Sequence, residues 1–176
     1  MGRRLASPAP TTSDVSLFRR KIARWFNTHK RSYPWRQTRN PFKVLIAEMM
    51  LRRTKANQVV PVYKRLFSEY PNPATLARAR GKKLNNILYP LGLRWRVPAF
   101  SLVARELVRR YKGKVPETRK ELITLPGVGE YVSGAVLSIA FDKKEWIVDS
   151  NIVRLLRRYF GIKTSKEGCR DKHVIE

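Results

Sequence analysis

The sequence predicts an all-α fold, and three observations lead to this prediction. Apolar residues recur at the spacing of an α-helix in most segments of the chain. No segment alternates apolar and polar residues for long enough to indicate a β-sheet. Glycine and proline residues fall between the helical segments, where they end one helix before the next begins. We therefore expect a series of short helices joined by tight turns.

Composition and charge restrict the function classes. The 176 residues suit one domain, or one large domain with part of a second, and 43% hydrophobic residues suffice for a core. The 38 Lys and Arg residues against 13 Asp and Glu give a formal charge of +25, which attracts polyanions, with nucleic acid the first candidate. A membrane surface is the alternative, although no apolar run is long enough to span a bilayer.

The N-terminal residues and the cysteine content bear on compartment and cofactor. The opening residues, Met-Gly-Arg-Arg-Leu, are not followed by an apolar segment, so we expect an intracellular protein of the cytoplasm or nucleoid. The single cysteine, Cys169, can form no internal disulfide and cannot alone hold a zinc ion or an iron–sulfur cluster. We therefore expect no metal and no other cofactor within this chain.

The N-terminal elements are a tail and an amphipathic helix. Residues 1–12 are small, basic and proline-rich, which predicts a flexible basic tail. Ser13 or Asp14 can cap the first helix. Its apolar stripe consists of Phe18, Ile22, Trp25 and Phe26. Tyr-Pro-Trp-Arg at 33–36 and Asn-Pro at 40–41 then interrupt the helical pattern.

Residues 42–51 are almost wholly apolar and predict a central helix that is buried on most sides. Glu48 is the exception within it. It either faces a gap filled with solvent, or it lines a pocket where desolvation raises the pKa of its carboxyl toward neutrality. The residues alone leave both interpretations open.

Further helices are predicted up to residue 111. Thr54 can cap a helix that we expect to be kinked near Pro61. Shorter helices follow at 73–80 and 82–91, and Gly92 stops the second. A basic and aromatic cluster, Leu-Arg-Trp-Arg at 93–96, precedes a helix over 97–111 that Gly113 closes.

Residues 125–129, Leu-Pro-Gly-Val-Gly, join two predicted helices at 117–123 and 130–140. Gly127 and Gly129 can adopt positive φ and leave no Cβ in the way of a close approach. The N–H groups of such a turn, and the helix N-terminus after it, point toward an anion, which in this basic chain is a DNA phosphate. This is helix-hairpin-helix geometry, and Leu125, Gly127, Val128 and Gly129 are its candidate DNA contacts. The alternative is an ordinary tight turn between two helices.

Asp149 opens the last predicted helix, which extends through Phe160. Aspartate is a favoured N-cap, and this alone explains the residue. A capping carboxylate that accepts backbone N–H bonds also stays ionised, so near bound DNA it could stabilise a developing sugar cation or orient a water molecule. The two roles are compatible.

Together these motifs resemble the helix-hairpin-helix DNA glycosylases of the endonuclease III and MutY superfamily. The resemblance covers roughly residues 13–161. It rests on Tyr-Pro-Trp-Arg at 33–36, Ala-Glu-Met-Met-Leu-Arg-Arg-Thr at 47–54, Gly-Leu-Arg at 92–94, Leu-Pro-Gly-Val-Gly at 125–129 and Val-Asp-Ser-Asn at 148–151. Each motif alone is weak, but the set in this order is specific.

The resemblance implies a fold and an activity. The fold is that of endonuclease III, with two helical lobes: a six-helix lobe over 41–148, and a second lobe built from the helix in 13–40 and a partial C-terminal segment, 149–176. The family flips a damaged or mispaired base out of the duplex and cuts its N-glycosidic bond. Asp149 matches the family's catalytic aspartate, and Glu48 its base-facing glutamate. Arg94 and Trp95, beside the third motif, become candidate DNA contacts.

The residue eighteen positions before Asp149 determines the implied subclass. Family members that also cut the DNA strand have a lysine there, whose amine forms a Schiff base with the sugar. Here the residue is Tyr131, and a phenol cannot form that imine. The resemblance therefore implies a monofunctional glycosylase that leaves an abasic site. Lys143 or Lys144 could in principle replace the lysine, but no motif supports this.

Two monofunctional branches remain. The archaeal-type thymine/uracil mismatch glycosylases are similar to this chain in Leu-Arg-Arg-Thr, in the tyrosine and in the glutamate, and we favour this branch. The adenine glycosylases share the glutamate but usually have Gln-Gln in place of Arg52 and Arg53, and serine in place of Tyr131. The two arginines could fill the space left by the flipped base and contact the orphan guanine, or they could simply contact phosphates.

The C-terminal residues depart from the family pattern. Family members typically carry four cysteines there that hold a [4Fe–4S] cluster, whereas this chain has Cys169 alone and ends within a helix that Asp171 would cap. The second lobe is therefore expected to be truncated. We expect a monomer that binds mismatched double-stranded DNA and no membrane, and a non-catalytic DNA-binding relic is the rival hypothesis.

Overall fold

A computed structural model describes residues 10–92 and 94–161, and it confirms the all-α prediction because no strand occurs in these ranges. The α-helices are α1 (Thr12–His29), α2 (Pro41–Leu51), α3 (Ala56–Glu69), α4 (Pro73–Ala77), α5 (Gly81–Leu88), α6 (Val97–Tyr111), α7 (Arg119–Leu122), α8 (Glu130–Ala140) and α9 (Ser150–Phe160). Three short 3₁₀ turns are η1 (Pro34–Arg36), η2 (Tyr89–Leu91) and η3 (Arg94–Arg96). None of these helices is long and apolar enough to cross a membrane.

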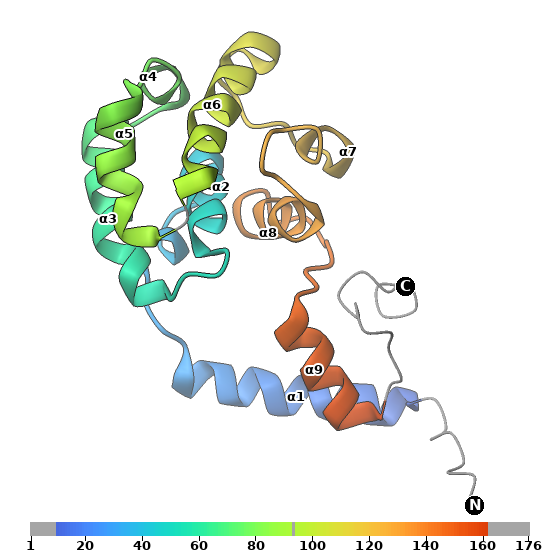
Figure 1. Cartoon of the computed structure of the whole chain (residues 1–176). Helices are drawn as coiled ribbons and strands as arrows, with labels where there is room; N and C mark the ends of the chain where they lie inside the picture. Colours follow the sequence, from blue (N-terminus) through green and yellow to red (C-terminus); the bar gives the residue numbers. More distant parts are fainter. Residues whose placement is uncertain (1–9, 93, 162–176) are drawn as a thin grey trace, which may run out of the picture. The chain divides into compact units, whose positions relative to one another are not determined.

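The chain divides into two compact units. The core unit is Ser32–Ile147 and contains α2 to α8 (Figure 1). The terminal unit combines Met1–Arg31 with Val148–Glu176, and its described helices are α1 and α9. Cys169 and Asp171 lie outside the described residues.

Helix α2 is the centre of the core unit, as its apolar sequence predicts. Asn40 caps it by accepting a hydrogen bond from the Lys43 N–H, and Pro41 occupies the first turn, where its missing N–H costs nothing. Every residue from 44 to 50 is buried, including Glu48. The helix packs against α3 on one side and α8 on another, and α4 packs against α6 (Figure 1).

The terminal unit is held by aromatic rings. The Phe18 ring on α1 lies 4.6 Å from that of Tyr159 and 5.0 Å from that of Phe160, both on α9. No α1 residue is buried, and the side chains of Trp25 and Phe26 are 60% and 55% exposed. Within the described residues, Phe18 is thus the residue of the apolar stripe whose ring contacts rings of α9, whereas the Trp25 ring stacks on His29 of its own helix.

Two helix starts differ from the sequence predictions. Helix α1 is capped by Thr11, not by Ser13 or Asp14; Asp14 instead completes a capping box by accepting from the Thr11 N–H. Helix α3 begins after Lys55, because the Thr54 hydroxyl donates to the Leu91 carbonyl rather than capping the helix. A neighbouring side chain, Thr11, thus caps α1, whereas no side chain caps α3, so residue preference alone does not locate either helix start.

Candidate active site and nucleic-acid interface

The hairpin between α7 and α8 forms as predicted, but its two glycines serve different purposes. Gly127 has φ +76°, which an L side chain rarely adopts, and a Cβ there would approach Ala99 Cβ at 3.1 Å and Met49 Cε at 3.2 Å. Gly129 is extended, with φ −116°, and it is the N-cap of α8 without any side-chain cap. The expectation of positive φ is therefore correct for Gly127 and wrong for Gly129.

Two of the predicted DNA contacts in the hairpin have buried side chains. Leu125 and Val128 are both part of the core, so only their backbone can face a ligand. The Val128 N–H already donates to the Leu125 carbonyl. The groups that this turn can offer to a phosphate are therefore its glycine amides and the uncapped first turn of α8.

Arg52 connects the hairpin to the end of α2. Its Nη1 donates to the Gly127 carbonyl at 3.1 Å, and its own carbonyl accepts from Arg96 Nη1 at 2.6 Å. These bonds join segments that lie 75 and 44 residues apart in sequence. Arg53, the next residue, is exposed and has φ +57°, an unfavourable conformation for a residue with a Cβ. The two arginines of the motif thus differ: Arg52 bonds within the protein, whereas Arg53 faces solvent.

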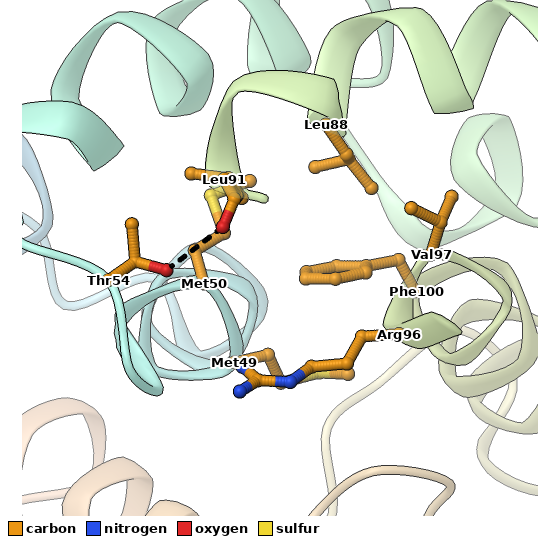
Figure 2. Close-up of a pocket in the computed structure, with 8 residues that line it drawn as sticks. All are labelled: Met49, Met50, Thr54, Leu88, Leu91, Arg96, Val97 and Phe100. Carbon is orange, nitrogen blue, oxygen red and sulfur yellow. Dashed lines mark hydrogen bonds between the residues drawn. The ribbon is translucent and has the colours of Figure 1, made fainter. Parts of the chain in front are cut away.

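Figure 2 shows a small apolar cavity beside this junction. It is lined by Met49, Met50, Thr54, Leu88, Leu91, Arg96, Val97 and Phe100. Its volume is about 10 Å³, too small for more than one water molecule. Burial, followed by repulsion from Arg52 and Arg53, lowers the pKa of the Arg96 guanidinium. The cavity is therefore a packing gap beside a basic cluster, and it is not large enough to hold a nucleobase.

Glu48 lies in a second cluster, on the buried part of α2. The residue is 1% exposed, so it does not face a gap filled with solvent, and desolvation raises the pKa of its carboxyl. Two weaker effects lower it: the positive charge of Arg36, whose Nη2 is 3.6 Å from Oε1, and hydrogen bonding from the Tyr131 side chain. No described residue makes a hydrogen bond of standard geometry to either oxygen of the Glu48 carboxylate. The cluster therefore brings together Glu48, Tyr131 and Arg36.

Arg36 was not singled out from the sequence as a site residue. It ends the Tyr-Pro-Trp-Arg motif, and η1 places it next to the buried Trp35. The signal was present in the motif, but the pairing of Arg36 with Glu48 depends on how η1 packs against α2, which periodicity does not reveal.

Asp149 lies in the terminal unit and caps α9, as predicted. Its Oδ1 accepts from the N–H groups of Asn151 and Ile152 at 2.9 and 2.8 Å, and its Oδ2 accepts from the Asn151 side-chain amide at 3.1 Å. Three donors therefore fix the orientation of this carboxylate. Its catalytic role stays a prediction.

The basic and aromatic cluster forms η3 at the start of α6. Trp95 is 71% exposed, and the Arg96 guanidinium lies 5.2 Å from the centre of its ring. Leu93 and the side chain of Arg94 lie outside the described residues. An exposed tryptophan beside arginines is suited to stacking on a nucleobase.

The residues present do not fit an iron–sulfur cluster. Such a cluster needs four thiolates, and the whole chain contains one cysteine. Within the described ranges, no three His, Cys, Asp or Glu side chains are grouped so as to hold a metal ion.

Comparison with known proteins decides the family. Residues 46–174 match the HhH-GPD superfamily of base excision DNA repair proteins, a range that contains Glu48, the hairpin and Asp149. This chain belongs to that superfamily. Among relatives of this chain, thymine/uracil-DNA glycosylase of Pyrobaculum aerophilum is 38% identical over 89% of this chain and 69% of the relative. Thymine-DNA glycosylase of Aeropyrum pernix is 36% identical over 87% of this chain and 70% of the relative.

The fold of this chain agrees with its assignment to the superfamily. A thermostable thymine-DNA glycosylase superposes with a TM-score of 0.87 at 34% identity, over 93% of this chain and 76% of that structure. Endonuclease III in a non-covalent DNA complex superposes with a TM-score of 0.76 at 29% identity, over 85% of this chain and 69% of that structure. The endonuclease III-like fold predicted from the motifs is confirmed.

Proposed function

We propose that the glycosylase hydrolyses the N-glycosidic bond of thymine or uracil mispaired with guanine and leaves an abasic site. The observation that carries the proposal is the buried Glu48 carboxyl beside Tyr131 and Arg36, in a chain whose relatives include thymine/uracil-DNA glycosylases at 36–38% identity. The proposed substrate is the mismatched duplex, bound by a monomer at the chromosomal DNA of the nucleoid.

Glu48 and Asp149 have complementary roles in the proposed reaction. Water adds to C1′ of the sugar, the N-glycosidic bond breaks, and its electron pair leaves with the base, which gains the proton that balances the one lost by water. Glu48, the pKa of whose carboxyl is raised by burial, donates a hydrogen bond or a proton to the base. Asp149, held by its three donors, stabilises the cationic sugar or orients the water.

The hairpin and the exposed basic residues supply the DNA contacts. The glycine amides and the uncapped N-terminus of α8 would hold a phosphate, and this contact is independent of sequence. Arg53 and Trp95 are exposed and available to the base opposite the flipped nucleotide. The formal charge of +25 predicts affinity that falls steeply with salt.

Strand cleavage is not part of the proposed activity. The phenol of Tyr131 cannot form a Schiff base, and Lys143, one possible substitute, is bonded to the Glu117 carbonyl with the Glu117 carboxylate 3.6 Å away. Borohydride should therefore trap no covalent adduct between the protein and DNA, and the strand should break only after added alkali. A trapped adduct that maps to Lys143 or Lys144 would contradict this assignment.

Excision of adenine from A·G or A·8-oxoguanine is the second candidate function. The observation that favours it is the same buried Glu48 carboxyl, because burial favours its protonated form and a purine leaves more readily once a ring nitrogen is protonated. Rat adenine DNA glycosylase is 36% identical over 85% of this chain, although the match spans 31% of that protein. Arg52, Arg53 and Tyr131 favour the thymine or uracil substrate.

The test is single-turnover base release from duplexes with G·T, G·U or A·8-oxoguanine, followed by alkali to reveal abasic sites. Release from G·T and G·U is expected, and release from the adenine duplex alone would support the second candidate. Asp149→Asn should lower the rate by roughly 10²–10⁴-fold, the usual contribution of one positioned group. Asparagine also caps helices, so the melting temperature should barely change. Equal rates would refute the role of Asp149, and no release by the parent would favour a non-catalytic DNA-binding protein.

A further inference from the structure

The segment between α8 and α9, residues 141–149, has no regular secondary structure but ends at Asp149. We name residues 142–149 the connector. Its residues up to Ile147 belong to the core unit, and Val148 begins the terminal unit. The last residues of the core unit therefore set the point at which the chain leaves this unit on its way to Asp149. Irregular backbone of this kind keeps one path only if side chains fix it.

Arg119 is the first residue of α7, and two of its three guanidinium nitrogens bond to the connector. Nε and Nη2 donate to Glu145 Oε2 at 3.0 and 2.6 Å, and Nη2 also donates to the Trp146 carbonyl at 3.0 Å. The guanidinium carbon lies 3.8 Å from the centre of the Trp146 ring. The side chain of Arg119 is 18% exposed, so these bonds are partly shielded from water.

The third nitrogen of Arg119 bonds to the start of α8. Nη1 donates to the Glu130 carbonyl at 3.0 Å and to its carboxylate at 2.8 Å, and it lies 3.5 Å from Ser133 Oγ. Glu130 directly follows the hairpin and directly precedes Tyr131. One guanidinium thus joins the connector to the helix turn that carries Tyr131. Only arginine has a planar set of donors that can bond to both sides at once.

Two features of α8 hold the connector independently of charge. A Cβ at Gly134 would collide with the Trp146 carbonyl oxygen, so the absence of a side chain lets the connector lie directly on the helix. One turn further, the Ser138 hydroxyl donates to the Glu145 carbonyl at 3.2 Å. Residues 145 and 146 are therefore fixed against α8 by three residues from two helices.

We propose that Arg119 is a positioning residue for Asp149. Asp149 follows Trp146 by three residues, which span at most about 10 Å even when fully extended. The anchor at residues 145 and 146 therefore fixes the point from which the short segment to Asp149 leaves the core unit. The inference rests on the proposed function of Asp149 and adds to it a residue that lies outside the sequence motifs quoted above.

The competing explanation is that these ion pairs only stabilise the core unit. A residue that acts through stability alone lowers the melting temperature without a selective effect on the chemical step. A positioning residue lowers the rate of the bound complex, because a misplacement of about 1 Å can cost 10²-fold in rate. The test must therefore separate the rate from both affinity and stability.

The main experiment compares Arg119→Met with Arg110→Met in the full chain. Arg110 bonds to Thr124 at 3.0 Å near the same hairpin but is not bonded to the connector, so the control removes an equal charge. Single-turnover release at saturating protein should fall roughly 10–100-fold for Arg119→Met and less than about threefold for Arg110→Met. The affinities of the two variants for mismatched duplex should agree within about threefold. Equal rates for the two variants would overturn the inference.

A second variant tests the position of the connector without changing charge. Gly134→Ala should displace the Trp146 carbonyl and slow release as Arg119→Met does, and Ser138→Ala should have a smaller effect in the same direction. Amide hydrogen exchange should be faster in the peptide that contains residues 145–149 for each slowed variant, and unchanged for Arg110→Met. Unchanged exchange in Arg119→Met would overturn the inference even if the protein were less stable.

The two proposals fail in distinguishable ways. If the parent releases no base, the proposed function fails and the positioning role fails with it, whatever the exchange data show. If the parent releases base, Asp149→Asn is slow and Arg119→Met is fast, only the positioning role fails. Arg119→Lys gives a further check: it keeps one ion pair but cannot bridge Glu130 and Glu145, so its rate should lie between those of parent and Arg119→Met.

Discussion

The core unit and the terminal unit bury their apolar residues to very different extents. The core unit contains a continuous set of fully buried side chains, among them Trp35, Leu45 and Leu66. Within the described part of the terminal unit, Val153 is the buried residue, and Trp25 and Phe26 are more than half exposed. The difference shows that the core unit has the packing to fold as a unit, whereas α1 and α9 depend on a few ring contacts.

The same contrast applies to the two functional carboxylates. Glu48 is held by burial, with no hydrogen bond of full geometry to its oxygens from any described residue, and burial raises the pKa of its carboxyl. Asp149 is less buried but accepts three hydrogen bonds. Burial favours the protonated form of Glu48, and the three donors fix the orientation of the Asp149 carboxylate, so each unit provides what its proposed role requires.

The largest expected effect is on the free energy of unfolding, and it appears when a buried tryptophan is compared with an exposed one. Trp35→Ala should lower the free energy of unfolding by about 3–5 kcal/mol, because the side chain is 2% exposed and packs against Tyr63 in the core. Trp25→Ala should change it by no more than about 0.5 kcal/mol, because its ring is mostly in solvent and stacks on His29 of the same helix. Urea unfolding measures both. A loss of several kcal/mol for Trp25→Ala would show that the terminal unit buries this face after all.

The next effect concerns the pH dependence of stability through Glu48. The fold raises the pKa of this carboxyl, so its favourable contribution is complete below the ordinary glutamate pKa, about 4.3, and is lost as pH rises through the raised value. Compared with Glu48→Gln, which does not titrate at this position, the parent should therefore lose stability as the pH rises from 4 to 8.

The control for this experiment is Glu117→Gln. Glu117 is exposed, and its ion pair with Lys143 is 3.6 Å long, so the difference from the parent should stay nearly flat over the same range. A flat difference for Glu48→Gln as well would show that Arg36 compensates the buried charge fully. In that case Glu48 would be ionised at neutral pH and could not act as the proton donor.

Local elements could be predicted from the sequence because short-range chemistry sets them. Residues 130–140 form α8 with the predicted bounds, Asp149 caps α9, and Gly127 has the predicted positive φ. The segment 117–123 forms a shorter helix, Arg119–Leu122, and the first helix is capped by Thr11 and not by Ser13 or Asp14. These errors concern the ends of elements, where capping choices differ by little free energy.

The contacts that join elements could not be predicted. The bond from Arg52 to Gly127, the pairing of Arg36 with Glu48 and the bonds from Arg119 to the connector link residues 12 to 75 positions apart. Each depends on the packing of one helix against another, and each uses an arginine that the sequence presents as one of many basic residues. Charge alone indicated DNA binding; only the structure distinguishes arginines bonded within the protein from those that face solvent.

The smallest expected effect is on the salt dependence of DNA binding, and it compares one solvent-facing arginine from each unit. Each phosphate contact contributes about 0.9 to the slope of log affinity against log salt, or roughly threefold in affinity between 50 and 200 mM. Arg53→Gln, in the core unit beside the hairpin, should therefore reduce the slope by about one contact. Arg20→Gln on α1 removes the same charge from an exposed position of the terminal unit, and should leave the slope unchanged if the hairpin side alone meets the backbone.

Titration of a fluorescent duplex at four salt concentrations measures both slopes. Equal reductions would place both units on the DNA, while a reduction for Arg20→Gln alone would reverse the comparison and remove Arg53 from the interface.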